Sequence, residues 1–207
     1  MTYSLTPELA LRAYAAGIFP MAPSHDSNDI DWIEPEQRGI IPLDHFHIPK
    51  KLHKILRRKI FDVQCNKNFA EVLMNCAKLT KDRHDTWINQ PIYNLNLELH
   101  RLGFAHSIEC WHNNELVGGL YGIALGSAFF GESMFSKVKE SSKVALCYLV
   151  SHLKVGGFTL LDTQFLTPHL QRFGAIEISK ADYKKKLQIA LQKTATFYPI
   201  IDQKDFD

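Results

Sequence analysis

The 207-residue sequence lacks several features that would mark a specialised class of protein. No apolar run approaches the roughly 18 residues that a membrane-spanning helix needs, and the first twenty residues lack the charged-then-apolar layout of a secretory signal. Its four cysteines, Cys65, Cys76, Cys110 and Cys147, show no CxxC spacing, which favours buried thiols over disulfides or a zinc site. We therefore expect a cytoplasmic protein.

A strong overall charge is also missing. The 24 Lys and Arg residues nearly balance the 22 Asp and Glu residues, so the net charge of +2 does not mark the whole chain as a nucleic-acid binder. With 45% hydrophobic and 22% charged residues, the composition is that of an ordinary globular protein. The pair His45 and His47 has no third ligand nearby in the sequence, and we predict no metal site.

Positive charge is instead concentrated in residues 50–59, which read KKLHKILRRK. Helical spacing places Leu52, Ile55 and Leu56 on one face and the cations on the other. Such a helix can be an ordinary solvated surface, or it can bind phosphates and release their condensed counterions. The candidate phosphate-binding residues are Lys50, Lys51, Lys54, Arg57 and Arg58.

Cap and turn signals predict two regions. Thr6 and Pro7 form a favourable helix start, and Gly17 can end that helix. The segment 18–49, rich in Pro, Asp and Gly, predicts short strands and loops. We therefore predict a small N-terminal domain over residues 1–60 and a larger domain over residues 61–207.

The second region alternates more regularly between strands and helices. Strands are predicted at 60–65 and 158–162, and a three-stranded meander at 106–130. Helices are predicted near 68–79, 90–102, 141–154, 166–173 and 180–193. Antiparallel strands followed by helix, strand and helix indicate an α+β protein.

Polar side chains stand where two of the apolar strands end. Glu132 follows an apolar run, and Asp162 and Gln164 lie two residues apart at the end of another. If the strand continues through Gln164, both side chains share one face, and the amide can orient the carboxylate through a hydrogen bond. Alternatively, Asp162 caps the next element, Gln164 is a surface residue and Glu132 is a structural carboxylate.

Several longer segments occur in a fixed order from residue 13 to about residue 175. They read AYAAGIFPM (13–21), TWIN (86–89), AHSIECW (105–111), ELVGGLYGIALGSAFFGESMFS (115–136), SKVAL (142–146) and LLDTQF (160–165) followed by HL (169–170). Together they resemble the leucyl/phenylalanyl-tRNA protein transferase family. Met21 and the WIEP segment at 32–35 depart from the tryptophan-containing segments of many members, which weakens any aromatic stacking there.

The resemblance implies a fold and an activity. The fold would be a small N-terminal α/β module joined to a GNAT-like acyltransferase domain with a mixed, mainly antiparallel sheet. The enzyme would transfer Leu, Phe or Met from aminoacyl-tRNA to proteins beginning with Arg or Lys, marking them for degradation. It would need no metal or coenzyme, and we expect a monomer.

Alternative activities stay open at this point. A GNAT-type enzyme that uses acyl-CoA would carry a pyrophosphate-binding loop, and QRFGAI (171–176) comes close to that pattern but ends in Ile176. A leucyl transferase that acts on acidic N-termini is a second possibility. A non-catalytic RNA-binding module would explain the basic helix but not the three polar residues at the strand ends.

The resemblance assigns the catalytic positions to Asp162, Gln164 and Glu132. The reaction is aminolysis of an ester, in which the attacking α-amine loses a proton and the ribose oxygen gains one. Because the pKa of an α-amine is about 7.7–8.0, positioning and proton transfer matter more than a strong base. We expect Asp162, aligned by Gln164, to accept or relay the proton and Glu132 to hold the cationic N-terminus of the acceptor.

The resemblance also implies binding surfaces for the aminoacyl-tRNA. Its pocket for the apolar amino acid maps onto Leu120, Phe129, Met134, Leu149 and Leu161. Taken singly, residues of this kind are far more often core residues, and only the resemblance assigns them to the pocket. Trp87 would stack on the terminal adenine, unless it is a buried core indole. The basic helix corresponds to a segment in which the family contacts the tRNA acceptor stem.

Overall fold

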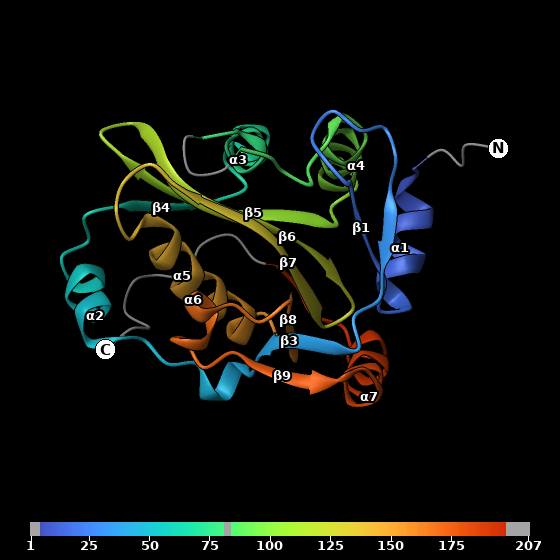
Figure 1. The fold of residues 1–207 in the computed structure, drawn as a ribbon. Coiled ribbons are helices and arrows are strands. Elements are labelled where there is room, and N and C mark those ends of the chain that lie inside the picture. The colour runs from blue at the N-terminus through green and yellow to red at the C-terminus, as the bar shows by residue number, and fades with distance from the viewer. Residues whose placement is uncertain (1–4, 81–83, 198–207) are drawn as a thin grey trace.

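The computed structural model of the protein describes residues 5–80 and 84–197 and centres on a mixed β-sheet (Figure 1). Its seven strands are β3 (Gln37–Ile41), β4 (Asp62–Cys65), β5 (Ala105–His112), β6 (Glu115–Leu125), β7 (Ala128–Ser136), β8 (Leu160–Gln164) and β9 (Ile176–Ser179). Across the sheet the order is β4-β5-β6-β7-β8-β3-β9. Neighbouring strands are antiparallel except β7 and β8, which run parallel. The predicted α+β class with a mixed, mainly antiparallel sheet is confirmed.

Helices cover both faces of this sheet, and a hydrophobic core lies beneath each layer (Figure 1). One face carries α2 (Lys50–Arg57), α5 (Ser141–Val155) and the short α6 (Pro168–Gln171). The other carries α1 (Pro7–Ala15), α3 (Phe69–Ala77), α4 (Gln90–Arg101) and α7 (Lys180–Leu191). Among the described residues, no helix is both long and apolar enough to cross a bilayer.

Local sequence explains where two of these helices begin and how closely they pack. Thr6 caps α1, because its Oγ1 accepts a hydrogen bond from the backbone N–H of Leu9 at 3.3 Å, and Pro7 follows in the first turn. The start of α5 lies so close to β6 at Gly118 that any Cβ there would overlap the side chain of Ser141. A glycine at this position therefore lets α5 lie directly on the sheet.

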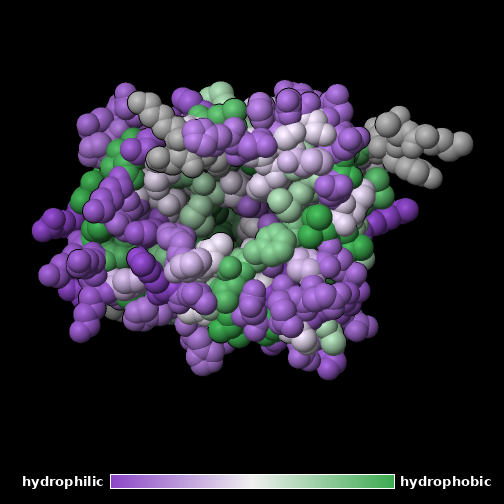
Figure 2. Space-filling model, in the orientation of Figure 1, coloured by the Kyte–Doolittle hydropathy of each residue, from purple (hydrophilic) through white to green (hydrophobic). Residues whose placement is uncertain are grey.

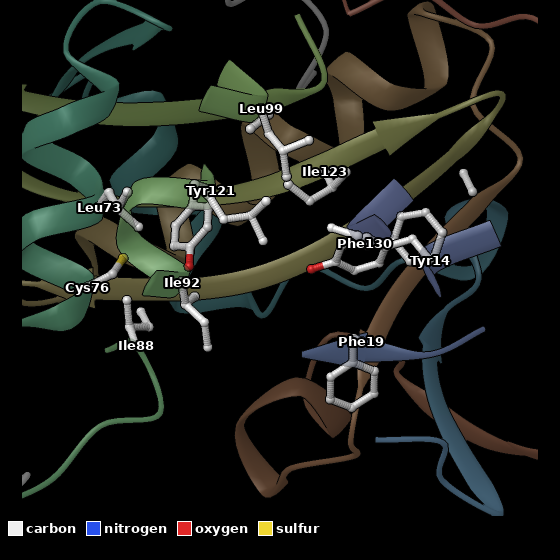
Figure 3. Packing of buried hydrophobic residues seen from close by; sticks show 14 of the residues in the cluster. Tyr14, Phe19, Leu73, Cys76, Ile88, Ile92, Leu99, Tyr121, Ile123 and Phe130 are labelled. Carbon is white, nitrogen blue, oxygen red and sulfur yellow. The ribbon is translucent and has the colours of Figure 1, made fainter. Parts of the chain in front are cut away.

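The N-terminal segment joins the main core as well as forming structure of its own. A separate two-stranded sheet consists of β1 (Phe19–Met21) and β2 (Asp31–Ile33). Tyr14 of α1 and Phe19 of β1 nevertheless pack beside Phe130 and Ile123 of the large sheet (Figure 3). Strand β3 lies inside that sheet, between β8 and β9. The domain boundary at residue 60 stays a prediction.

Several details differ from the sequence-based expectations. Strand β9 falls in a stretch for which the sequence predicts no strand, because its four residues are too few to show a period. The helix expected near 166–173 shortens to α6, and the strand expected at 60–65 begins at Asp62. The expected thiols form no disulfide, and three of them are buried while Cys65 is partly exposed.

Candidate active site

The site lies where β7 and β8 separate. The two strands pair only from Ala128 with Leu160 to Phe130 with Asp162, and beyond that point they diverge. A cavity of about 330 Å³ opens between the diverging ends, bounded by β6, α5 and α6. The space-filling view shows a hollow near the middle of this face, with apolar residues gathered beside it (Figure 2). The wall includes Leu120, Met134, Leu146, Leu149, Leu161 and Leu170.

Four of the predicted substrate-binding residues line this cavity. They are Leu120, Met134, Leu149 and Leu161. Phe129 does not line it. Its side chain is fully buried behind the wall, where its ring stacks on Phe197 and meets Phe158 edge-on. Trp87 is also outside the cavity wall and packs, half-buried, against the core on the opposite face of the sheet.

Behind the cavity lies a closed polar network around Asp162. Its carboxylate, which is 0% exposed, forms an ion pair with Arg38, which is 1% exposed. Arg38 donates from Nε to Oδ1 at 3.0 Å and from Nη2 to Oδ2 at 2.6 Å. Tyr183 donates its hydroxyl to Oδ2 at 2.6 Å, and the backbone N–H of Gln164 donates to Oδ1 at 2.7 Å. Both carboxylate oxygens are thus occupied by protein donors.

Arg38 connects this network to the N-terminal segment. Its Nη1 donates to the carbonyl of Gly17 at 2.9 Å, and its guanidinium lies over the rings of Phe19 and Tyr183 at 4.6 Å and 4.5 Å. Burial lowers the pKa of Arg38, but the hydrogen bonds and charge of Asp162 outweigh it and leave the pKa raised. No sequence pattern singles out Arg38, because it stands alone on a short strand 124 residues before its partner.

Glu132 lies at the cavity wall in a more open setting. Its Oε1 accepts hydrogen bonds from the Tyr14 hydroxyl and from the Gln164 side-chain amide, both at 2.9 Å. No hydrogen bond to Oε2 occurs within the described part of the chain. Burial raises the pKa of Glu132 to about 8, and the nearby charge of Asp162 adds to this, although hydrogen bonds from Tyr14 and Gln164 oppose it.

The side chain of Gln164 contacts a different carboxylate from the one expected. Gln164 has a left-handed backbone with φ of 62°, which interrupts the alternation of the strand. Its side-chain amide consequently turns to Glu132, and only its backbone N–H contacts Asp162. Gln164 therefore links the two carboxylates, one through its main chain and one through its side chain.

The arrangement suits proton transfer beside a substrate group that is apolar. A carboxyl group whose pKa is near 8 exchanges protons readily at neutral pH. It stands beside a cavity large enough for one apolar side chain. The Asp162 network behind it is fixed by a buried ion pair and cannot easily rearrange.

The predicted basic helix forms as α2. Leu52 and Leu56 are buried against the core that includes α5, while the five candidate phosphate-binding residues are exposed: Lys50, Lys51, Lys54, Arg57 and Arg58. His45 and His47 lie just before it. In residues 5–80 and 84–197, no group of His, Cys, Asp or Glu side chains is arranged to hold a metal ion.

Comparison with known proteins identifies similar families and relatives. The family model for leucyl/phenylalanyl-tRNA protein transferase matches residues 40–188, and the model for its N-terminal domain matches residues 3–36. A protein named leucyl/phenylalanyl-tRNA protein transferase in Paramagnetospirillum magneticum is 56% identical over 93% of this chain and 92% of its own length. One of the same name in Zymomonas mobilis is 54% identical over 95% of this chain and 73% of its own.

Among solved structures the similarity is weaker. A DUF2156 domain from Agrobacterium fabrum superposes with a TM-score of 0.44 at 10% identity and covers 95% of this chain and 65% of that one. The structure of L-PGS from Bacillus licheniformis gives a TM-score of 0.40 at 16% identity and covers 90% and 63%. At these scores, nothing about this chain follows from either structure.

Proposed function

The chain belongs to the leucyl/phenylalanyl-tRNA protein transferase family, and from this premise we propose that it transfers leucine, phenylalanine or methionine from aminoacyl-tRNA to proteins that begin with Arg or Lys. The observation that supports this best is an apolar cavity with Glu132 at its wall, whose Oε2 has no partner among the described residues. The protein acts as a cytoplasmic monomer and marks its acceptors for degradation.

The cavity receives the side chain of the transferred amino acid. Its volume of about 330 Å³ is at the lower end for ligand sites, which suits one amino-acid side chain rather than a larger cofactor. Met134 has a flexible thioether that can adapt to Leu, Phe or Met. Phe129 supports the wall from behind. Trp87 packs partly against the core on the other face of the sheet, and only its exposed part is available to stack on the terminal adenine.

Peptide-bond formation requires one proton to leave and another to arrive. The acceptor α-amine attacks the ester carbonyl carbon, the bond to the ribose oxygen breaks, and that oxygen takes up a proton as it leaves. The pKa of Glu132, raised to about 8, lies close to the value of about 7.7–8.0 for an α-amine. Glu132 is therefore well matched to hold the amine and to exchange its proton.

Asp162 acts mainly as a positioning residue. Its oxygens accept from Arg38, Tyr183 and the backbone of Gln164, and its side chain is fully buried. These contacts favour a fixed carboxylate over one that accepts a proton from the substrate. By holding the backbone of Gln164, Asp162 directs the Gln164 amide to Glu132.

Direct assay of transfer tests the proposal. The protein is incubated with charged leucyl-tRNA and with peptides that begin with Arg, Lys, Asp, Glu or Ala. We expect labelled leucine on the Arg and Lys peptides, and deacylated tRNA with free leucine serves as the control. Transfer to the Asp and Glu peptides instead would reassign the acceptor, and acyl transfer from acetyl-CoA without tRNA would replace the proposed donor.

A further inference from the structure

Unpaired polar atoms gather at the cavity. Within the described residues, five buried side-chain atoms have no hydrogen-bond partner, and three of them belong to residues that line this cavity. The three are Tyr121 Oη, Thr163 Oγ1 and His169 Nε2. Buried polar atoms in proteins are nearly always paired. The Tyr121 hydroxyl points into the core beside Ile92 (Figure 3), so Thr163 and His169 are the two residues for which a ligand in the cavity could supply the partner. A cavity for a purely apolar side chain would not need them.

His169 has the most informative surroundings of the three. It belongs to the HL segment that follows β8, and it stands in the first turn of α6, which Thr167 caps through a hydrogen bond from Leu170 N–H at 3.3 Å. The edge of its ring meets Phe173 at 5.5 Å between centroids. The imidazole is therefore held in place although its Nε2 has no partner among the described residues.

The surroundings of His169 lower its pKa and so favour the neutral imidazole. Burial lowers its pKa, Lys143 and Arg172 lower it further, and Glu140 opposes them. Glu140 is itself paired with Lys143 at 2.7 Å. A neutral imidazole carries one donor and one acceptor nitrogen, as a hydroxyl partner requires.

The surroundings distinguish between the two substrates. A cationic acceptor N-terminus would be repelled by Lys143 and Arg172 and attracted to Glu132. A ribose offers neutral hydroxyl groups, and its phosphate would be attracted by the same two cations. We propose, on the basis of the proposed function, that His169 Nε2 hydrogen-bonds a ribose hydroxyl of the aminoacylated nucleotide and thereby positions the ester.

Binding of a non-reactive substrate tests this hydrogen bond without requiring turnover. The probe is leucyl-adenosine joined through a 3′-amide, made with and without its 2′-hydroxyl. For the unmodified protein we expect removal of the 2′-hydroxyl to weaken binding about tenfold, as for removal of one hydrogen bond. His169→Phe should bind both probes equally weakly, and His169→Gln should regain part of the difference. If His169→Phe still prefers the 2′-hydroxyl about tenfold, the proposal is wrong.

A second histidine provides a matched control. His152 on α5 also has a buried Nε2 without a partner among the described residues, but it lies against Phe197 and does not line the cavity. His152→Phe should leave the preference for the 2′-hydroxyl unchanged. His169→Phe removes a buried polar atom that has no partner among the described residues, so its melting temperature should stay the same or rise, which separates weaker ligand binding from misfolding.

Transfer kinetics distinguish this inference from the proposed function. His169→Phe should raise the KM for leucyl-tRNA about tenfold and leave the KM for an Arg peptide unchanged. A rise in the peptide KM alone would assign His169 to the acceptor and overturn the proposal. If the unmodified protein binds the probe but transfers nothing, the proposed function fails, while the binding series still decides the role of His169.

Discussion

Two carboxylates of the same site stand in opposite surroundings. Asp162 is closed in by Arg38, Tyr183 and a backbone N–H, and nothing can approach it without breaking these bonds. Glu132 shares Gln164 with it but keeps one oxygen, at the cavity wall, free of hydrogen bonds from the described residues. The difference shows that residue type alone does not assign a chemical role. Because their hydrogen-bond partners differ, Asp162 has a structural role and Glu132 is the candidate to contact substrate.

The largest effect is expected on folding stability, when Arg38 is removed from the network around Asp162. Arg38→Met should destabilise the fold by about 3–5 kcal/mol, because it leaves the Asp162 carboxylate buried without its cation. Urea unfolding measures the change. Arg101→Met, which removes the cation of the exposed pair with Glu98, is the matched control and should have almost no effect. Equal decreases in stability in the two variants would show that the buried ion pair matters no more to folding than the exposed one.

Glu132→Gln should strongly lower transfer. Gln retains an oxygen for the Tyr14 and Gln164 donors but cannot exchange a proton, so we expect transfer to fall about 100-fold. Because the titration of the peptide amine is common to both proteins, the difference between their pH profiles isolates Glu132. That difference should be centred near pH 8. Identical profiles would remove Glu132 from the proton exchange.

The same variant gives a stability test whose sign is fixed. The pKa of Glu132 is raised from an ordinary 4.5 to about 8, so between these values the folded protein binds more protons than the unfolded chain. The contribution of Glu132 to stability therefore falls as pH rises through this window. Melting curves should show Glu132→Gln more stable than the unmodified protein at pH 8.5, with the gap shrinking toward pH 4.5. A gap that widens on acidification would contradict the raised pKa.

A smaller effect, on the choice of amino acid, is expected from changing the shape of the cavity. Met134→Phe adds bulk at the cavity wall, so transfer of Phe should fall about tenfold relative to transfer of Leu. Competition between leucyl-tRNA and phenylalanyl-tRNA measures the ratio. Met74→Phe, on the exposed part of α3, makes the same chemical change away from the cavity. If both variants leave the ratio unchanged, the cavity does not select the amino acid.

The smallest effect concerns the exposed cations of α2. Lys54→Gln combined with Arg57→Gln should weaken tRNA binding modestly and lower the slope of log K against log salt by about 0.7–0.9 for each phosphate that is no longer bound. Lys185→Gln combined with Lys186→Gln on α7 is an exposed control of the same charge change. If the control variant lowers the salt slope as much as the α2 variant does, α2 is an ordinary solvated surface.

The same contrast separates what the sequence could predict from what it could not. Asp162, Gln164 and Glu132 each follow an apolar run in the sequence, and the fold brings all three together, although Glu132 lies within β7 rather than at its end. Their partners could not be predicted, since Arg38 is 124 residues from Asp162 and Tyr14 is 118 residues from Glu132. Long-range pairing of this kind leaves no local pattern. The left-handed backbone of Gln164 leaves no local pattern either, because the sequence simply predicts that the strand continues through it.

The site is assembled from residues that are synthesised at different times, among them Tyr14, Arg38 and Tyr183. The ribosome synthesises Tyr14 and Arg38 well before Tyr183 on α7, which follows Arg38 by 145 residues in the sequence. A nascent chain that has not reached α7 therefore lacks the Tyr183 hydrogen bond to Asp162, and the site is complete only after α7 has been synthesised. Stalling translation before Lys180 should yield nascent chains without transfer activity, and activity in such chains would show that α7 is dispensable.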